Sequence, residues 1–334
     1  VYGRLVTDGT AGDPVYFTSL YDDSVGGDTD GDGGLITPNS GDWEGINLFD
    51  GGSLEIKNSK IDYAYIGIDS EYGNGLFDSV SIFHSVLAVY LYESTFNINN
   101  LNVDDVSFNA LSFYSSSTVT VSNSVITNVI KYGVEIDNST STFNNLIMDG
   151  GLSGAMDISN NSYASITNSV IKNFFSGADV YENSELDFEN SMMENIVGIS
   201  SAFATYNNSK INISSSTVNE INGDYAFDVF NNSNMTISDS LLENFHGQYA
   251  IDVFGDDNGY ATSTLEITNS KINNGDKNGL FVYRRANATL NNVEISNFLW
   301  SGVYTYANPQ ITITDSTIFN NDYGIESYGA NINI

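Results

Sequence analysis

A short Asn-Ser or Asp-Ser segment recurs along the chain, and this recurrence constrains the fold more than any other feature. Clear copies begin at Thr167 (TNSVIKN), Glu189 (ENSMMEN) and Thr268 (TNSKINN). Eleven steps between aligned copies cover 257 residues, or about 23 residues per step. A fixed period of about 20–50 residues is typical of solenoid proteins. The aligned second residues are Ser59, Ser79, Asp105, Ser124, Asn145, Ser169, Ser191, Ser216, Ser240, Ser270, Asn292 and Ser316.

Within each repeat, apolar and polar residues alternate over three to five positions, as in TLEITNS from Thr264. Alternation with a period of two indicates β-strands rather than helices. Three short strands separated by turns form one coil of a parallel β-helix, and coils stack at about 4.8 Å. The sequence therefore predicts an all-β chain, a parallel β-helix solenoid of about 12–14 coils of about 23 residues each.

Two columns of asparagine are expected at the turns. Asparagine tolerates the left-handed backbone conformation, and its amide can bond to the coils on either side. We therefore interpret these residues as structural. The first column is predicted to contain Asn58, Asp78, Asp104, Asn123, Asn144, Asn168, Asn190, Ser215, Asp239, Asn269, Asn291 and Asp315, and the second Asn109, Asn128, Asn173, Asn195, Asn244, Asn274 and Asn320.

The chain is expected to form one continuous domain. Residues 1–50 are interpreted as N-terminal coils that carry an acidic Gly/Asp-rich loop at 20–44, and residues 51–334 as regular coils. The sequence opens at Val1 without methionine and inside an expected strand. We interpret it as a fragment of a longer chain, and we expect strand edges at its ends that could associate end to end.

The repeat resembles the pectin-lyase-like superfamily of right-handed parallel β-helices over essentially the whole chain. The segments GRLVTDGTAGDPVYFTS, DDSVGGDTDGDGG and GDWEGI within residues 3–48 are similar to an N-terminal segment of bacterial extracellular β-helix repeat surface proteins. This resemblance implies a right-handed β-helix in a secreted or cell-surface protein. It does not imply one activity, because the fold hosts lyases, hydrolases, epimerases and adhesins.

Composition excludes several classes of function. The net charge of −32 repels nucleic-acid phosphates and anionic lipid headgroups, so neither partner is expected. The chain has no cysteine, which excludes zinc–thiolate sites and cysteine nucleophiles. No run of 18 apolar residues is present, so no membrane insertion is expected.

The acidic loop is a candidate calcium site. Its carboxylates alternate with glycines in the run DTDGDG at 28–33, which is similar to the start of an EF-hand-type loop, although Asn39 replaces the acidic twelfth residue. Asp42 and Glu44 could complete the set of oxygen ligands around the ion. Closely packed carboxylates repel one another unless a cation lies among them, so a structural Ca²⁺ is predicted, with a solvated loop as the alternative. The predicted ligands are Asp22, Asp23, Asp28, Asp30 and Asp32.

One sheet is predicted to carry two outward columns of side chains. The first is largely acidic and contains Asp69, Tyr90, Ser112, Glu135, Asp157, Asp179, Ala204, Asp228, Asp252, Phe281, Tyr304 and Glu326; the second is largely aromatic. Such a strip is either a structural ladder or a surface that contacts glycans or proteins. The predicted ligand-binding residues are Tyr181, Tyr206, Phe230, Phe254, Tyr283, Tyr306, Asp157 and Asp179.

Catalytic candidates depend on the type of enzyme. A lyase would need a basic residue, and Lys277, Arg284 and Arg285 are expected to cluster one coil from Asp252, Asp256 and Asp257. A retaining glycosidase would use the neighbours Asp228 and Asp252, about 4.8 Å apart at the backbone. An enzyme would need one coil that interrupts the repeated outward columns with a long loop. The 30-residue step between Ser240 and Ser270 is the best place for such a loop. His84 and His246 are expected to have no partner.

The leading interpretation is a non-catalytic extracellular or cell-surface module, adhesin-like or structural, that is stabilised by calcium and contacts glycans or other surface components. The repetition of the acidic column over many coils favours an extended surface over a single site. The first alternative is a carbohydrate-active enzyme, either a polyuronate lyase or a glycosidase. The second is a spacer or a filament subunit that assembles end to end.

Overall fold

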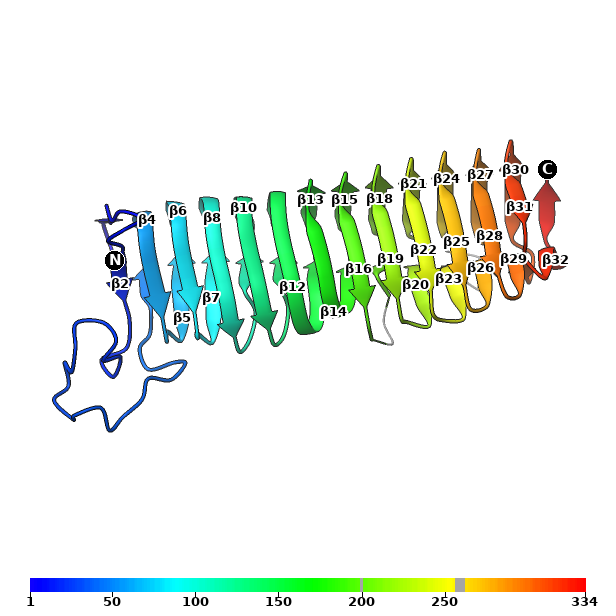
Figure 1. The fold of residues 1–334 in the computed structure, drawn as a ribbon. Coiled ribbons are helices and arrows are strands. Elements are labelled where there is room, and N and C mark those ends of the chain that lie inside the picture. The colour runs from blue at the N-terminus through cyan, green and yellow to red at the C-terminus, as the bar shows by residue number, and fades with distance from the viewer. Residues whose placement is uncertain (199–200, 256–261) are drawn as a thin grey trace. The chain divides into compact units, whose positions relative to one another are not determined.

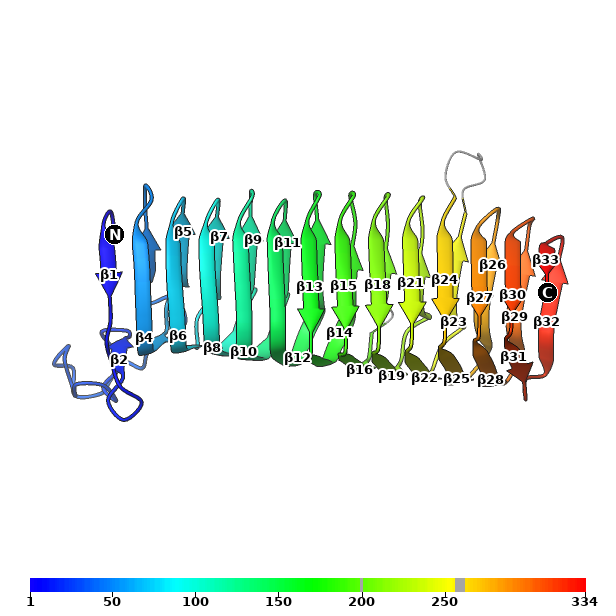
Figure 2. The same cartoon turned by 90° about the horizontal axis from the view of Figure 1, so that it is seen from above.

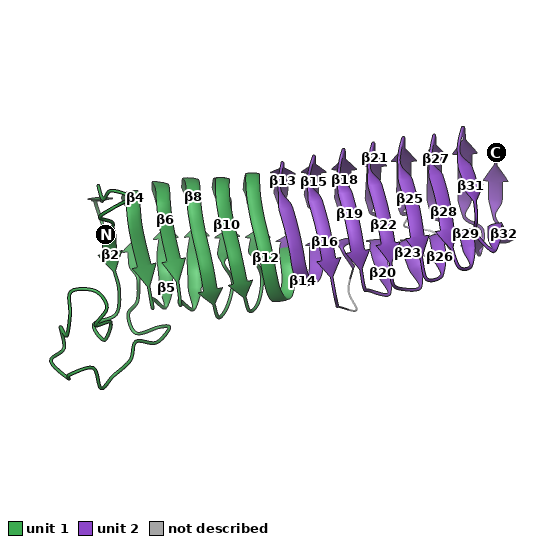
Figure 3. Cartoon of the chain, viewed as in Figure 1, with its two compact units in different colours: residues 1–156 green, residues 157–334 purple. Residues whose placement is uncertain are grey.

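The computed structural model describes residues 1–198, 201–255 and 262–334, which form a parallel β-solenoid of about twelve turns without a helix. The described chain divides into two compact units, residues 1–156 and 157–334 (Figure 3). Each unit is described by itself. Within a unit, each turn presents three strand faces, called faces 1, 2 and 3 in chain order, and equivalent strands of successive turns pair in parallel (Figure 1).

In unit 1, long strands bend from face 1 into face 2, and shorter strands form face 3. The long strands are β4 (Ser53–Asp62), β6 (Asn74–Phe83), β8 (Thr95–Val106), β10 (Thr118–Val129) and β12 (Thr140–Ser159), preceded by β1 (Arg4–Val6) on face 1 and β2 (Val15–Phe17) on face 2. β12 continues into face 3, and its residues 157–159 belong to unit 2. Face 3 contains β3 (Ile46–Leu48), β5 (Ile66–Glu71), β7 (Leu87–Tyr92), β9 (Leu111–Tyr114) and β11 (Val134–Asp137).

In unit 2 the three faces have separate short strands (Figure 2). Face 1 contains β13 (Tyr163–Thr167), β15 (Glu185–Glu189), β18 (Lys210–Ser214), β21 (Asn234–Ser238), β24 (Thr264–Thr268), β27 (Asn287–Asn291), β30 (Gln310–Thr314) and β33 (Asn331–Asn333). Face 2 contains β16 (Met192–Ile196), β19 (Thr217–Ile221), β22 (Leu241–Phe245), β25 (Lys271–Gly275), β28 (Glu294–Phe298) and β31 (Thr317–Phe319). Face 3 contains β17 (Phe203–Thr205), β20 (Tyr225–Val229), β23 (Tyr249–Phe254), β26 (Asn278–Tyr283), β29 (Ser301–Tyr306) and β32 (Tyr323–Tyr328), and β14 (Val170–Val180) runs from face 2 into face 3.

The core is a set of apolar columns that run through the coils. On face 1, Ile237 pairs with Ile267, then Leu290 and Ile313 occupy the same position in the next two coils. All four side chains are nearly or fully buried. Because alternate residues of a strand point to opposite sides, this inward column fixes which residues face solvent.

Serine and asparagine ladders hold the corner between faces 1 and 2. The Ser216 backbone N–H donates to Ser240 Oγ at 3.1 Å, and Ser216 Oγ donates to the Ser214 carbonyl at 2.7 Å. Beside this ladder, Asn292 Nδ2 donates to Asn269 Oδ1 at 3.0 Å. These bonds satisfy backbone and amide groups at a corner where strand pairing is interrupted.

The predicted first asparagine column is wrong by one residue at Asp78, Asn144 and Asn291 and by four at Asp104. The left-handed residues are Ser79, Asn100, Asn145 and Asn292, each with φ between 52° and 61°. These coils lack the serine used for alignment, because Val80, Leu101, Leu146 and Val293 take its inward place. With the corrected positions the steps are 21–25 residues, apart from one of 30 that includes the undescribed residues 256–261.

The second column is confirmed at six of its seven predicted positions, which are left-handed; the exception is Asn109. Asp105 takes the left-handed position in that coil, with φ 53°. Asn109 is instead fully buried and donates to Glu135. A third set of left-handed residues, in pairs such as Asn231–Asn232, turns face 3 into face 1 and was not predicted.

Asn269 tests the contribution of the corner ladder. Its φ is 50°, it donates to Asp239 Oδ1 at 3.1 Å and it accepts from Asn292. Asn269→Ala should lose both bonds and add backbone strain, and lower the free energy of unfolding by about 2–3 kcal/mol. Asn269→Gly removes the bonds without the strain. Its loss of unfolding free energy should therefore be about 1 kcal/mol smaller than that of Asn269→Ala. Denaturant unfolding measures both, and an equal loss for the two variants would contradict a role for the left-handed conformation.

Candidate functional site

The acidic and aromatic columns predicted on one sheet lie on the outer side of face 3. In unit 2, strand pairing puts Asp179, Ala204, Asp228 and Asp252 at the same position of successive coils. The aromatic column lies two residues further along each strand, where Phe254, Tyr283, Tyr306 and Tyr328 are in register. The predicted order of both columns is therefore confirmed in this unit.

A third outward position, occupied by Tyr225 and Tyr249, was missed. Tyr225 pairs with Tyr249, and their rings stack with centroids 5.9 Å apart at an angle of 4°. The next residue in each strand is a buried alanine, Ala226 or Ala250, and a second buried residue follows it. Two consecutive buried residues break the alternation used to predict outward positions. The shared pattern YA-x-DV at 225–229 and 249–253 was the signal that could have found this position.

These positions enclose a hollow of about 410 Å³ on face 3 of unit 2. In the acidic column, the coil between Asp179 and Asp228 has the small residue Ala204, whose side chain is almost completely buried and does not line the hollow. The structure therefore brings together the predicted Asp157, Asp179, Tyr181 and Tyr206 with Asp228, which was predicted only as a catalytic candidate. The complete lining is Asp157, Asp179, Tyr181, Ser201, Tyr206, Tyr225 and Asp228.

Two carboxyl groups of the hollow, and one in the next coil, have raised pKa values. Burial, and then the charges of Asp157 and Asp228, raise the pKa of Asp179 to about 7. Burial raises the pKa of Asp228 to about 6, against the lowering effect of a hydrogen bond from Tyr206. In the next coil, burial and the charge of Asp228 raise the pKa of Asp252 to about 8. Both protonated and ionised carboxyl groups are thus available close to neutral pH.

Tyrosine hydroxyl groups bond to these carboxyl groups. Tyr181 Oη donates to Asp157 Oδ1 at 2.7 Å, and Tyr206 Oη donates to Asp228 Oδ2 at 3.4 Å. Burial, then the charges of Asp228 and Asp179, raise the pKa of Tyr206, so its hydroxyl stays protonated and remains a donor. The hollow therefore presents hydroxyl donors and carboxylate acceptors next to an aromatic ring, an arrangement that suits a polyhydroxylated ligand.

The remaining predicted ligand-binding residues form a ladder in which the rings contact one another. Phe230 lies 4.7 Å from Phe254, Phe254 lies 5.2 Å from Tyr283, and Tyr283 stacks on Tyr306 at 5.6 Å, all between ring centroids. The interplanar angles of these three pairs are 36°, 45° and 19°. This column therefore has the contacts of a structural ladder.

The basic catalytic candidates do not lie together. Lys277 precedes β26 and lies over the Trp300 ring, with Nζ 5.4 Å from its centroid, whereas Arg284 and Arg285 follow β26. A strand of six residues separates them by roughly 20 Å. Arg284 lies over the rings of Phe254 and Tyr283 at 5.0 and 4.7 Å. Asp256 and Asp257 lie outside the described residues.

The two histidines have partners, so the expectation that they stand alone is wrong. His84 Nδ1 lies 2.8 Å from Asp62 Oδ1, and its ring stacks on Tyr63. His246 lies 3.4 Å from Glu220 and 3.7 Å from Asp276. These partners belong to neighbouring coils, which the sequence places about 20–30 residues away.

Three of the five predicted calcium ligands converge. One carboxylate oxygen from each of Asp23, Asp28 and Asp32 lies within 4.8 Å of the others, and no other such group occurs among the described residues. Asp23 Oδ1 is shielded from solvent without a hydrogen-bond partner. Burial, followed by the charges of Asp28, Asp30 and Asp32, raises the pKa of Asp23. Such mutual repulsion is what a bound cation would relieve.

Asp22 and Asp30 have other contacts. Asp22 accepts from Thr18 Oγ1 at 2.7 Å and Ser24 Oγ at 2.5 Å. Burial opposes its ionisation, but these hydrogen bonds outweigh burial and lower its pKa. Asp30 Oδ1 accepts the Asp32 backbone N–H at 3.2 Å.

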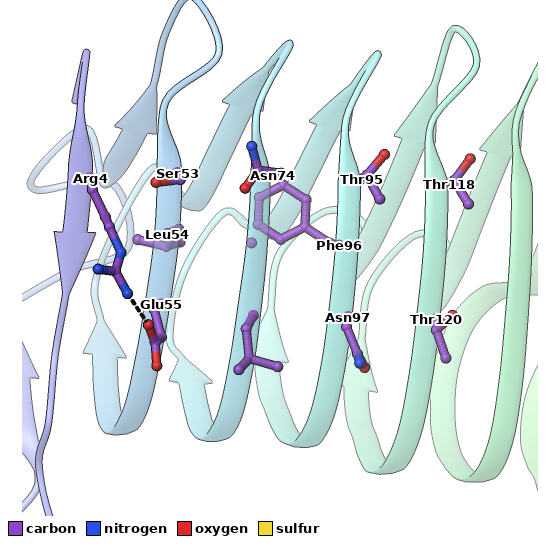
Figure 4. Close-up of a pocket in the computed structure, with 12 residues that line it drawn as sticks. Arg4, Ser53, Leu54, Glu55, Asn74, Thr95, Phe96, Asn97, Thr118 and Thr120 are labelled. Carbon is purple, nitrogen blue, oxygen red and sulfur yellow. Dashed lines mark hydrogen bonds and ion pairs between the residues drawn. The ribbon is translucent and has the colours of Figure 1, made fainter.

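A second depression, of about 530 Å³, lies on face 1 of unit 1 (Figure 4). Its outward side chains are mostly hydroxyl and amide groups, including Asn74, Thr95 and Thr118. Its carboxylate Glu55 is paired with Lys57 and Arg4, which lower its pKa. The lining thus has no carboxyl group poised near neutral pH, and the hollow on face 3 is the better candidate site.

Comparison with protein families matches the right-handed β-helix region over residues 36–155, 109–263 and 201–334. The chain belongs to the right-handed β-helix family. No curated protein sequence matches it. No helix among the residues of this β-helix that the structure describes is long and apolar enough to span a membrane.

Solved β-helix structures share the fold at low identity. A mutant of the periplasmic alginate epimerase AlgG is 9% identical with a TM-score of 0.53, over 90% of this chain and 79% of that one. A GH87 α-1,3-glucanase catalytic domain in complex with nigerose is 15% identical with a TM-score of 0.50, and the match covers 97% of this chain and 70% of that one. The Agl-KA catalytic domain is 13% identical with a TM-score of 0.51, and the match covers 86% of this chain and 62% of that one. These likenesses show the fold alone.

The raised carboxyl pKa values predict a dependence of stability on pH. Between pH about 4 and 8, the folded state keeps protons on these groups that the unfolded chain has released, so their contribution to stability falls as pH rises. Asp252→Asn removes one of these ionisations. Its melting temperature should exceed that of the wild type increasingly from pH 5 to 9, by about 2–4 °C per kcal/mol of ionisation cost removed.

The control for this measurement is Glu266→Gln, at an exposed position on face 1. The melting temperature of this variant should differ from that of the wild type by the same amount at every pH. An Asp252→Asn protein that is equally destabilised at pH 5 and pH 9 would show that Asp252 ionises as easily in the fold as in the unfolded chain.

Proposed function

We propose that the protein is an extracellular or cell-surface β-helix module that binds an uncharged glycan in the hollow on face 3. The proposal rests on the hollow itself, where three carboxyl groups and three tyrosines surround about 410 Å³. Carboxylate oxygens and tyrosine hydroxyl groups are the partners that sugar hydroxyl groups need, and a ring face packs against the apolar side of a sugar. A location outside the cytoplasm is consistent with that of the periplasmic alginate epimerase, whose fold this chain shares.

Charge supports an uncharged glycan over a polyuronate. Three carboxyl groups line the hollow, and its lining contains no lysine or arginine. The chain as a whole has a net charge of −32. A ligand that carries a carboxylate on each sugar would meet repulsion without a compensating cation. The solved GH87 relative binds nigerose, an oligosaccharide, which is consistent with a neutral glycan on this fold.

Asp179 provides the direct test of binding. Above the Asp179 pKa of about 7, where this group is ionised, Asp179→Asn should weaken glycan affinity roughly ten- to hundredfold, since a hydrogen bond to a charged group contributes about 1.5–3 kcal/mol. Titration calorimetry with a panel of neutral glucans, mannans and galactans measures this. Asp69→Asn is the matched control, because Asp69 occupies the same column in unit 1 outside this hollow. An equal effect of the two substitutions, or binding of polyuronates alone, would contradict the proposal.

A second candidate function, glycoside hydrolysis with inversion, is favoured by the pair Asp179 and Asp228. Their coils are separated by one coil, so their backbones lie about 9–10 Å apart. This spacing allows the roughly 6.5–9.5 Å between carboxyl groups that an inverting pair needs for its water. Asp179, with the higher pKa, would be the acid and Asp228 the base.

Hydrolysis should be fastest between pH about 6 and 7. Below this window Asp228 becomes protonated and cannot act as a base; above it Asp179 loses the proton it would donate. NMR of the first product anomer and a pH–rate profile test this assignment. Binding of a glycan without turnover at any pH would exclude hydrolysis of that glycan and leave the binding function in place.

We also propose that Asp23, Asp28 and Asp32 hold a structural Ca²⁺. Adding Ca²⁺ should raise the melting temperature of the wild type, and a chelator should reverse the effect, because cation binding removes carboxylate repulsion in the loop. Asp28→Asn should abolish this response. Asp13→Asn, outside the cluster, should retain it. A melting temperature that is unchanged by Ca²⁺ and chelator would contradict a structural ion.

A further inference from the structure

The hollow on face 3 of unit 2 offers many more hydrogen-bond acceptors than donors. The described residues of its lining carry three carboxyl groups, three tyrosine hydroxyl groups and one serine hydroxyl group, and none has an amide or a basic side chain. Each ionised carboxylate has about four acceptor sites, whereas each hydroxyl group donates one hydrogen bond. Two of these donors are already used, because Tyr181 bonds to Asp157 and Tyr206 bonds to Asp228. A ligand rich in donors therefore fits this lining best.

Asp179 is the carboxyl group of the hollow that most needs a partner. Among the described residues, no side chain donates a hydrogen bond to it or forms an ion pair with it. Burial and the charges of Asp157 and Asp228 oppose its ionisation and raise its pKa to about 7. A positive charge bound beside Asp179 would relieve this repulsion.

The spacing of the carboxyl groups favours an organic cation over a metal ion. The oxygen ligands of a calcium ion lie about 2.3–2.6 Å from it and must therefore converge. Asp23, Asp28 and Asp32 converge within 4.8 Å, and no other group among the described residues does so, including the aspartates of the hollow. The backbones of Asp179 and Asp228 lie about 9–10 Å apart, since one coil separates theirs. A ligand that contacts both must be larger than a single ion.

Aromatic rings provide a second attraction for a positive charge. Tyr181, Tyr206 and Tyr225 line the hollow together with the carboxyl groups. The face of an aromatic ring carries partial negative charge and attracts an ammonium group within about 6 Å of the ring centroid. Hydrogen bonds from an ammonium group to carboxylates are also stronger than those between neutral groups. The lining therefore combines the two kinds of group that recognise organic ammonium ions.

We propose that the hollow binds an amino sugar more tightly than the matching uncharged sugar. In an amino sugar, an ammonium group replaces one ring hydroxyl group. This group would lie beside Asp179, and the remaining hydroxyl groups would reach Asp228 and the tyrosines. An ammonium group has three donors and no acceptor, whereas a hydroxyl group has one donor and two acceptor lone pairs, so the exchange corrects the imbalance of the lining. This inference rests on the proposed glycan-binding function and names the class of sugar that the site prefers.

The experiment compares three β-1,4-linked oligosaccharides of equal length, built from glucose, N-acetylglucosamine or glucosamine. They differ at carbon 2, which carries a hydroxyl, a neutral acetamide or an ammonium group. Titration calorimetry at pH about 6.5, where ordinary amines are protonated, measures their affinities. The glucosamine oligomer should bind at least about tenfold more tightly than the glucose oligomer. The acetamide removes the charge, so the N-acetylglucosamine oligomer should lack this advantage.

A second readout is the proton balance of binding. At this pH a large fraction of Asp179 is protonated in the free protein. An ammonium group beside it would lower its pKa, so binding of the glucosamine oligomer should release protons. Calorimetry in two buffers with different heats of ionisation measures this release, and the glucose oligomer should show less of it.

Variants control for non-specific attraction of a cationic oligosaccharide to a chain with a net charge of −32. Asp179→Asn should remove most of the advantage of glucosamine over glucose. Asp69→Asn removes a carboxyl group from the same column outside the hollow and should retain the advantage. Both substitutions replace a carboxyl group by an amide of the same size, so they isolate the effect of the charge.

Three results would overturn the preference for an amino sugar. These are absence of binding by the glucosamine oligomer, equal affinity of the wild type for the glucosamine and glucose oligomers, and an equal advantage of glucosamine in both variants. Binding of a neutral glycan that depends on Asp179 would still support the proposed function in each case. Failure of the wild type to bind any of these oligomers or any glycan of the neutral panel would overturn both.

Discussion

The left-handed corner residue and its ladder of hydrogen bonds set the register on which the rest of the structure depends. Each coil must turn sharply three times, and a side chain that accepts a positive φ at little cost, usually asparagine, lies at most of these turns. Its amide bonds to the equivalent residue of the neighbouring coil, as Asn190 does to Asn168 at 2.6 Å. Buried serines such as Ser191 and Ser216 fix the same corner from inside.

This register has a direct consequence for electrostatics. Equivalent residues of successive coils lie side by side, so a carboxylate repeated at one position is brought close to its own copies. On face 3 of unit 2 the outcome is a set of buried aspartates with pKa values near neutrality. Asp179 and Asp228, from the coils on either side of Ala204, both line the hollow on this face.

The sequence alone predicted the solenoid, its period and the order of the two outward columns, because alternation and spacing are local signals. The same signals failed where a coil departs from the pattern. Leu101 and Val293 replace the serine that marks the corner, so the alignment slipped in those coils. Tyr225 was missed because the extra buried residue Ala226 shifts the alternation. His84 and its partner Asp62 are neighbours only across coils, which a scan for local motifs does not detect.

The hollow could not be predicted from residue types, since it depends on which side chains of successive coils leave space between them, and one lining residue, Ser201, looks unremarkable in the sequence. Of the two interpretations of the aromatic column, the ring contacts fit the structural ladder from Phe230 to Tyr306, whereas Tyr181, Tyr206 and Tyr225 line the hollow. The acidic column repeats, as expected, but the pattern of large and small side chains does not.

A crystal structure of the wild-type protein soaked with a neutral oligosaccharide at neutral pH tests this account most directly. We predict density for a sugar in the hollow, in contact with Asp179, Asp228 and Tyr225. Density for a sugar that lies across Phe254, Tyr283 and Tyr306 instead, with the hollow filled by solvent, would contradict the assignment of the hollow as the functional site.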